Sequence, residues 1–126
     1  MTKKHQPIQL KEALDLYEQH HTNLKSRSDK RALWMNCVGV SLCKEKSRIN
    51  SALIRLQEWA NSQPIRKPLW EKWEKMLLNK QDLKTVLENT EDNQELRSVS
   101  PLCASIQPIE HKMALTFFQK SINPKP

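Results

Sequence analysis

The chain has 126 residues, of which 28% are charged and 37% hydrophobic, and its formal net charge is +7. This length suits one domain, and the composition is typical of a folded protein rather than a disordered one. The single glycine excludes the glycine-rich phosphate loops of P-loop and Rossmann enzymes, and it disfavours β-sheet proteins, which need glycine in hairpin turns. We therefore expect one all-α domain over residues 1–126, a compact orthogonal bundle of about five to seven short helices.

The positive charge is concentrated in the first half of the chain. Residues 1–68 hold 13 Lys or Arg against 6 Asp or Glu, whereas residues 69–126 hold 8 of each kind. A basic half can attract phosphate backbones, an anionic membrane surface or an acidic protein. No apolar run approaches the roughly 20 residues that span a bilayer, and the N-terminal residues MTKKHQPIQL lack the apolar core of a signal peptide. We therefore expect a cytoplasmic protein without a membrane span.

Apolar residues recur at helical spacing along most of the chain, and breaks in this pattern separate the expected helices. In chain order we expect helices at residues 8–21, 28–42, 47 to before Pro64, 68–78, 80–88 and 90–96, and a last helix from Pro108 onward. In this last helix, Ile109, Met113 and Phe117 are expected to pack inward, with Leu115 and Phe118 as further candidates. Residues 1–7 and 122–126 are expected to form flexible tails.

The stretch from Ser28 to Asn61 organises the expected bundle. Its first helix is apolar on most sides, as a central buried helix is, and its second helix carries a regular apolar stripe. Ser28 and Ser47 are the expected N-caps, because a serine hydroxyl accepts a free amide proton of the first turn. Gly39 lies inside the first helix, where it is about 1 kcal/mol less favourable than alanine. We interpret it as a point where another helix crosses closely, in preference to a functional turn.

The cysteines and histidines show no spacing that indicates a metal site. The three cysteines lack a C-x-x-C pair and the four histidines lack H-x-x-x-H spacing, which disfavours zinc ligation and a disulfide framework. A cysteine could be paired with His111 and Glu110 for nucleophilic catalysis, but the cysteines of the apolar stretches would form thiolates poorly. We expect no metal, no cofactor and no enzymatic activity.

Four tryptophans, Trp34, Trp59, Trp70 and Trp73, are many for a chain with 6% aromatic residues. Most of them should lie in the core, with the indole N–H groups bonded at its margin. Trp70 and Trp73 are three residues apart and share one side of the expected fourth helix. If one of these two stays exposed, it is the best candidate for contact with a partner protein or for stacking on a nucleic-acid base.

Residues 42–56 resemble the turn and recognition helix of winged-helix DNA-binding regulators. In such modules a polar turn precedes a capping serine, an apolar residue, an Ala-Leu pair and a final leucine, which here are Ser47, Ile49, Ala52-Leu53 and Leu56. The resemblance implies that the remaining polar side chains of the helix face DNA: Lys46, Arg48, Asn50, Ser51 and Arg55. The β-hairpin that forms the wing has no counterpart after this stretch, which contains two prolines and no pair of strands.

These observations favour a small non-catalytic helical binding protein. The first hypothesis is a protein-interaction or adaptor module, with Trp70 and Trp73 as the partner-binding candidates. The alternative is a basic nucleic-acid-binding regulator, of antitoxin or mobile-element type, which contacts phosphates through Lys44, Lys46, Arg48 and Arg55. Seven cations and two acids between Lys25 and Arg48 support this alternative. An enzyme with an unfamiliar Cys or His site is the third hypothesis.

Overall fold

The computed structural model describes residues 10–122, apart from the side chains of Lys80 and Gln81. This part of the chain is all-α and has no strand, which confirms the predicted fold class. Its longer helices are α1 (Lys11–His20), α2 (Arg27–Leu42), α3 (Lys46–Ser62), α4 (Lys67–Leu78), α6 (Glu91–Ser98) and α7 (Pro108–Phe117). The shorter elements are η1 (Pro64–Arg66), α5 (Lys80–Leu83), η2 (Lys84–Leu87), η3 (Pro101–Ser105) and η4 (Phe118–Ile122). The expected tails lie outside the described residues, except for Ile122. None of the described helices is long and apolar enough to cross a membrane.

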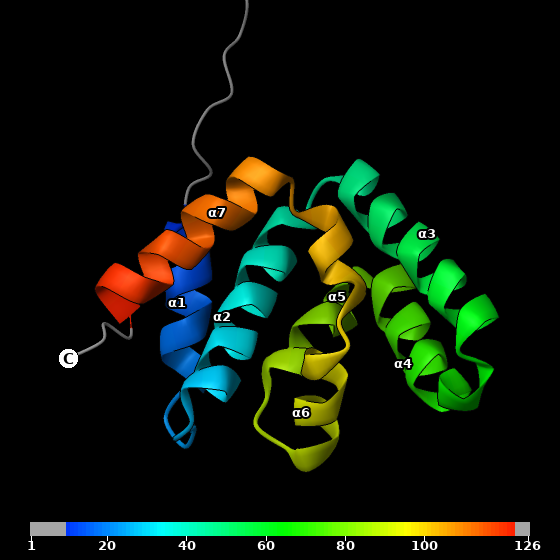
Figure 1. The fold of residues 1–126 in the computed structure, drawn as a ribbon, viewed down its shortest axis with the longest axis horizontal. Helices are drawn as coiled ribbons and strands as arrows, with labels where there is room; N and C mark the ends of the chain where they lie inside the picture. The colour runs from blue at the N-terminus through cyan, green and yellow to red at the C-terminus, as the bar shows by residue number, and fades with distance from the viewer. Residues whose placement is uncertain (1–9, 123–126) are drawn as a thin grey trace, which may run out of the picture.

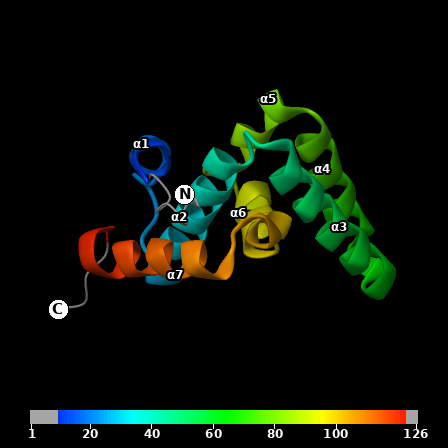
Figure 2. The ribbon, with the colours of Figure 1, turned by 90° about the horizontal axis from the view of Figure 1, so that it is seen from above.

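Helix α2 runs through the middle of the bundle (Figure 1). Helices α1 and α7 lie on one side of it and the antiparallel pair α3 and α4 on the other, as the view from above also shows (Figure 2). The side chains of α2 that are fully buried are Leu33, Trp34, Cys37 and Val38. The prediction of a central buried helix is therefore confirmed.

The indole of Trp34 holds the helices on one side of α2 together. Its Nε1–H donates a hydrogen bond of 2.8 Å to the carbonyl oxygen of Ala114 in α7. The same ring meets Tyr17 of α1 edge to face, at 6.0 Å between centroids, and stacks on Phe117 at 5.4 Å. One side chain thus contacts both α1 and α7, with its only polar atom bonded, as a buried indole requires.

Gly39 lies where η3 crosses α2. A Cβ atom built on Gly39 would lie 2.7 Å from the Cβ of Leu102 and 3.1 Å from its Cδ1. The expectation of a close crossing is confirmed, although the crossing element is a short 3-10 helix. The sequence pattern gave no element at residues 101–105, because five residues are too few for a hydrophobic period.

Two predicted helix caps are wrong. The N-cap of α2 is Ser26, whose Oγ accepts a hydrogen bond of 3.1 Å from the amide of Asp29, and Ser28 lies inside the first turn. Helix α3 begins one residue before the predicted cap Ser47, after an extended Glu45 whose side chain caps nothing. Sequence position alone does not distinguish serines two residues apart, because each can accept an amide proton of the next turn.

Helix α7 begins at Pro108 as predicted, and its inward face agrees with the prediction in part. Phe118 is buried and Phe117 packs on Trp34 of the core, whereas Ile109 is 52% exposed and Met113 is only partly buried. Glu110 is buried on the inward face, next to the exposed Ile109. Its Oε1 accepts a hydrogen bond of 2.9 Å from the amide of Gln107, and its carboxylate also pairs with Arg48 of α3. A charged residue with a partner far away in sequence therefore sets the orientation of the helix.

A candidate binding groove

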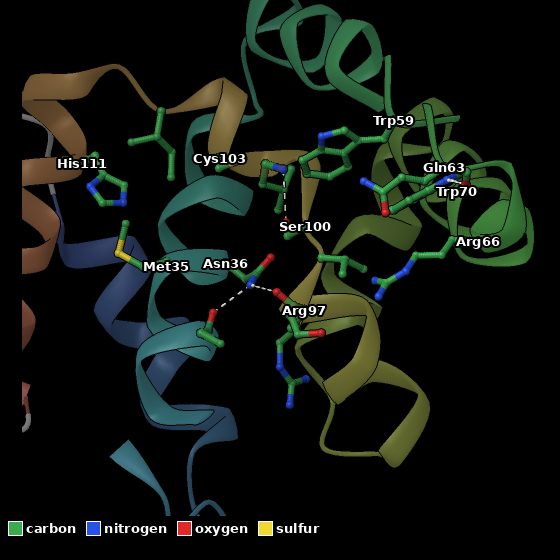
Figure 3. A pocket seen from close by; sticks show the side chains of 15 residues that line it. Met35, Asn36, Trp59, Gln63, Arg66, Trp70, Arg97, Ser100, Cys103 and His111 are labelled. Carbon is green, nitrogen blue, oxygen red and sulfur yellow. Dashed lines mark hydrogen bonds between the residues drawn. The ribbon is translucent and has the colours of Figure 1, made fainter. Parts of the chain in front are cut away.

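A groove of about 490 Å³ lies between α2, η3 and the turn that joins α3 to α4 (Figure 3). We call it the central groove. Its wall includes Asn36 of α2, Trp59 of α3, Arg66 and Trp70 of the α3–α4 turn and helix, and Cys103 of η3. The volume falls in the range of about 300–1,000 Å³ that is usual for ligand sites. Three segments far apart in sequence thus form one concave surface.

The side-chain amide of Asn36 lies at the base of the central groove. Its Nδ2 donates hydrogen bonds to the carbonyl oxygens of Ala32, at 2.7 Å, and Arg97, at 3.3 Å. Both partners are acceptors, so the amide must turn its NH₂ group toward them. The Oδ1 atom is buried and receives no hydrogen bond from any described residue. A buried carbonyl oxygen left in this state is unfavourable by about 1–3 kcal/mol.

Arg97 lies beside Asn36, which donates to its carbonyl oxygen, but its charged side chain is not in the groove. Its side chain is buried, and its Nη1 donates to the carbonyl oxygens of Val86, at 2.7 Å, and Glu88, at 3.0 Å. Figure 3 shows the guanidinium directed away from the groove. Burial lowers the pKa of Arg97 from its ordinary value, and the hydrogen bonds offset part of the loss of hydration. This residue has a structural role, in holding the loop after η2 against α6.

Two indole rings and one guanidinium form the opposite wall. The rings of Trp59 and Trp70 are 5.5 Å apart between centroids, and Trp70 Nε1–H donates to the carbonyl oxygen of Gln63 at 3.0 Å. Arg66 is exposed and extends toward the groove in Figure 3, and it pairs with no described residue. No Asp or Glu lines the groove, where the charged or titratable side chains are Arg66, Arg97, Cys103 and His111. The groove therefore combines apolar surface with positive charge.

The two tryptophans predicted as partner-binding residues are both buried. Trp73 is fully buried, and its Nε1–H donates to the carbonyl oxygen of Leu96 at 3.0 Å. Trp70 is 4% exposed, although it is one of the residues that line the groove. Neither ring is exposed in the way that contact with a partner would require. Both are core residues, which was the alternative interpretation of the sequence. The partly exposed ring at the groove is Trp59, which sequence reasoning did not single out.

Of the four predicted nucleic-acid contacts, Arg48 is not available to a ligand. Its guanidinium forms a bidentate pair with Glu110, at 2.5 and 2.9 Å, and also donates to Glu45 and to the carbonyl oxygen of Ser105. The side chain is 17% exposed, and the hydrogen bonds with Glu110 raise the pKa of Arg48 further above its ordinary value. We therefore correct this assignment, because contact with DNA would require a partly buried ion pair to break.

The other three cations lie on the surface. Lys44 pairs with Glu12 of α1 at 2.5 Å, and Arg55 pairs with Glu58 at 3.2 Å, while Lys46 is exposed at the start of α3. Residues 43–45 do form a short turn between two helices, as the winged-helix resemblance implied. However, α3 is followed by η1 and α4, and the described chain contains no strand that could form a wing.

The thiols and histidines of the described residues form no cluster with obvious chemistry. Cys37 and Cys43 are buried, and burial raises the pKa of the Cys37 thiol, which keeps it neutral. Cys103 is exposed at the groove. Within residues 10–122, no three His, Cys, Asp or Glu side chains lie together in a way that could hold a metal ion. Comparisons with protein-family models, curated proteins and solved structures gave no match to this chain.

Proposed function

We propose that this is a non-catalytic helical binding protein that holds a segment of a partner protein in the central groove. The observation that carries the proposal is the central groove itself, a hollow of about 490 Å³ whose wall combines the partly exposed ring of Trp59 with the exposed side chain of Arg66 and contains no carboxylate.

The apolar lining of the central groove suits a peptide ligand. Trp59 presents partly exposed aromatic surface, and Val99 lies beside it on the segment that enters η3. Aromatic surface next to a few fixed polar groups is typical of sites that anchor a partner side chain. A catalytic use finds less support, because no hydrogen bond is found between Cys103 and a histidine or acid of the described residues.

Nucleic-acid binding is the competing proposal, and the structure gives it less support than the sequence did. Arg48, at its centre, is paired with Glu110, and two of the remaining cations have acidic neighbours. Lys46 remains as an exposed cation at the start of α3. Phosphate binding through surface cations would weaken steeply with salt, so it can be recognised in the same set of experiments.

The test is a selection of 12-residue peptides from a random displayed library on the wild-type protein, followed by titration of the enriched peptides. Cys103→Phe places bulk inside the groove at an exposed position, and we expect it to weaken binding at least tenfold. Thr116→Phe makes a similar change at an exposed site on α7 and serves as the matched control. Circular dichroism confirms that both variants fold.

Two outcomes would overturn the proposal. In one, no peptide is enriched; in the other, Cys103→Phe and Thr116→Phe bind the enriched peptides equally well. Binding of a DNA duplex that falls steeply between 50 and 200 mM salt, and falls again in Lys46→Ala, would favour the nucleic-acid proposal instead.

A further inference from the structure

We propose that the outer face of α3 and α4 binds the same face of a second copy of this protein, so that two chains form a reversible dimer through a four-helix bundle. We define the outer face by exposed residues that do not line the central groove, which are Ile54, Glu58 and Asn61 of α3 and Glu71, Lys75 and Leu78 of α4. The inference therefore concerns a surface that the proposed function does not use. It rests on exposed apolar side chains, on residue spacing and on charge.

The outer face exposes large apolar side chains. Ile54 is 63% exposed and Leu78 is 69% exposed, and only two other large apolar side chains of the described residues are exposed at all. A groove of about 470 Å³ lies between α3 and α4, with Leu53 and Leu78 in its wall. The two helices form one end of the molecule, which leaves this side open to a partner (Figure 2). Apolar surface beside a groove between helices is typical of a site that another helix covers.

The spacing of residues along α3 matches the spacing along α4. The two helices run antiparallel (Figure 1), and Leu53 and Leu78 line the same groove, so Ile54 and Leu78 lie at nearly the same height. A helix rises 1.5 Å per residue, which places Asn61 about 10.5 Å from Ile54, and Glu71 about 10.5 Å from Leu78, both toward η1. If α3 of a second copy lies antiparallel on α4 with its Ile54 on Leu78, its Asn61 is therefore level with Glu71.

A two-fold axis parallel to the helices makes each of these contacts occur twice. It places α3 of each copy on α4 of the other, so that Ile54 of each copy meets the partner's Leu78. The side-chain amide of Asn61 can then donate a hydrogen bond to the carboxylate of the partner's Glu71. The face is therefore complementary to itself, as an interface between identical chains must be.

Charges on the outer face match in the same arrangement. Glu58 lies about 6 Å from Ile54 along α3, and Lys75 lies about 4.5 Å from Leu78 along α4, both toward η1. Lys75 forms no ion pair with a described residue, and Glu58 forms only an exposed pair with Arg55. In the dimer, Glu58 of each copy lies beside the partner's Lys75. Two ion pairs at the edge of the interface thus favour this orientation.

The size of the face and the net charge of the chain predict a weak dimer. Helices of 17 and 12 residues are about 25 and 18 Å long, and two of them side by side are about 20 Å wide. A face of this size lies at the low end of specific interfaces. The net charge of +7 opposes association, but at physiological ionic strength the Debye length of about 8 Å screens the charges far from the interface. We therefore expect a dissociation constant between about 1 µM and 1 mM.

Sedimentation equilibrium of the full chain tests the dimer, in about 0.15 M salt and from about 10 µM to 1 mM protein. We expect the mean mass to rise toward that of two chains. Ile54→Asp and Leu78→Asp should each weaken association at least tenfold, because each new carboxylate enters the interface twice. Ile109→Asp makes the same change at a 52% exposed position of α7, and this matched control should weaken association less than twofold. Circular dichroism confirms that the variants fold.

An exchange of charges tests the orientation of the two chains. Glu58→Lys and Lys75→Glu should each weaken the dimer about threefold or more, because like charges then meet at two edges of the interface. The double variant should associate within twofold of the wild type, since the ion pairs form again in reverse.

Three results would overturn the proposal. The chain stays monomeric at about 1 mM, which leaves the outer face to a partner of different sequence. Ile54→Asp associates as tightly as the wild type, which shows that the dimer uses another surface. The double charge variant associates as weakly as the single variants, which excludes the pairing of α3 with the partner's α4.

Discussion

The side chain of Arg48 joins three segments of the molecule. Its guanidinium connects α3 to Glu110 of α7 and to the carbonyl oxygen of Ser105 in η3, and the hydroxyl of Ser105 donates to the carbonyl oxygen of Arg48 itself at 2.5 Å. Removing one partner of an ion pair that is mostly shielded from water lowers the stability of the protein strongly, because the other charge stays buried without a partner. Arg48 is therefore a residue of the fold, although it belongs to the basic half of the sequence.

We predict that Arg48→Ala lowers the free energy of unfolding by about 3 kcal/mol, the low end of the range for a broken buried pair. The low end is chosen because some solvent reaches the guanidinium. Arg55→Ala removes an exposed pair on the same helix and should change stability by less than about 0.5 kcal/mol. Urea denaturation of both variants measures the difference. Equal effects would mean that Arg48 is a surface cation, and they would restore it as a candidate contact for nucleic acid.

Between elements, η3 approaches α2 closely at Gly39. The side chain of Leu102 packs directly against the backbone of α2 at this point, where a Cβ atom on Gly39 would lie 2.7 Å from Leu102 Cβ. The residues of η3 also pack on α3 through Ser105 and form part of the central groove. The packing of η3 on Gly39 therefore positions one wall of the groove.

Gly39→Ala tests this packing through the sign of its effect. In an unconstrained helix, the change would stabilise the protein by about 1 kcal/mol. Here the new methyl group meets a Cβ atom, which cannot rotate away, and such overpacking costs about 1–3 kcal/mol. We expect a net loss of stability and a weaker affinity of groove peptides, measured by thermal unfolding and titration. A higher melting temperature would contradict the packing role of Gly39.

The helices could be predicted from the sequence, whereas the partners of individual side chains could not. Hydrophobic spacing located the central helix α2, and the proline at residue 108 marked the start of α7, because both features depend on local sequence. The pattern placed Ile109 on the inward face of α7, where Glu110 is buried instead, since the burial of Glu110 depends on Arg48, which lies 62 residues away. The central groove was missed for the same reason, because its wall combines residues that are far apart in sequence, from α2, the α3–α4 pair, α6, η3 and α7.

At the scale of the whole molecule, the arrangement of the helices raises the question of whether they unfold together. Figure 2 shows α3 and α4 side by side, at the far end of the molecule from α1 and α7. Two features connect this pair to the rest. Arg48 and Ser105 link α3 to η3, and the indole of Trp73 in α4 donates to the carbonyl oxygen of Leu96 in α6. The buried side chains also form one continuous cluster from α1 to α7.

We predict a single cooperative unfolding transition, because one hydrophobic core with buried hydrogen bonds across it gives no boundary at which half of the protein could unfold alone. Two spectroscopic signals test this. Trp59, Trp70 and Trp73 lie in α3 and α4, so tryptophan fluorescence mainly follows this pair, whereas far-ultraviolet circular dichroism follows every helix. The two urea transitions should share one midpoint and one slope. If fluorescence changes at a lower urea concentration than circular dichroism, α3 and α4 unfold separately from the rest of the protein. Ligands of the central groove should then raise the midpoint of the fluorescence transition more than the midpoint of the circular dichroism transition.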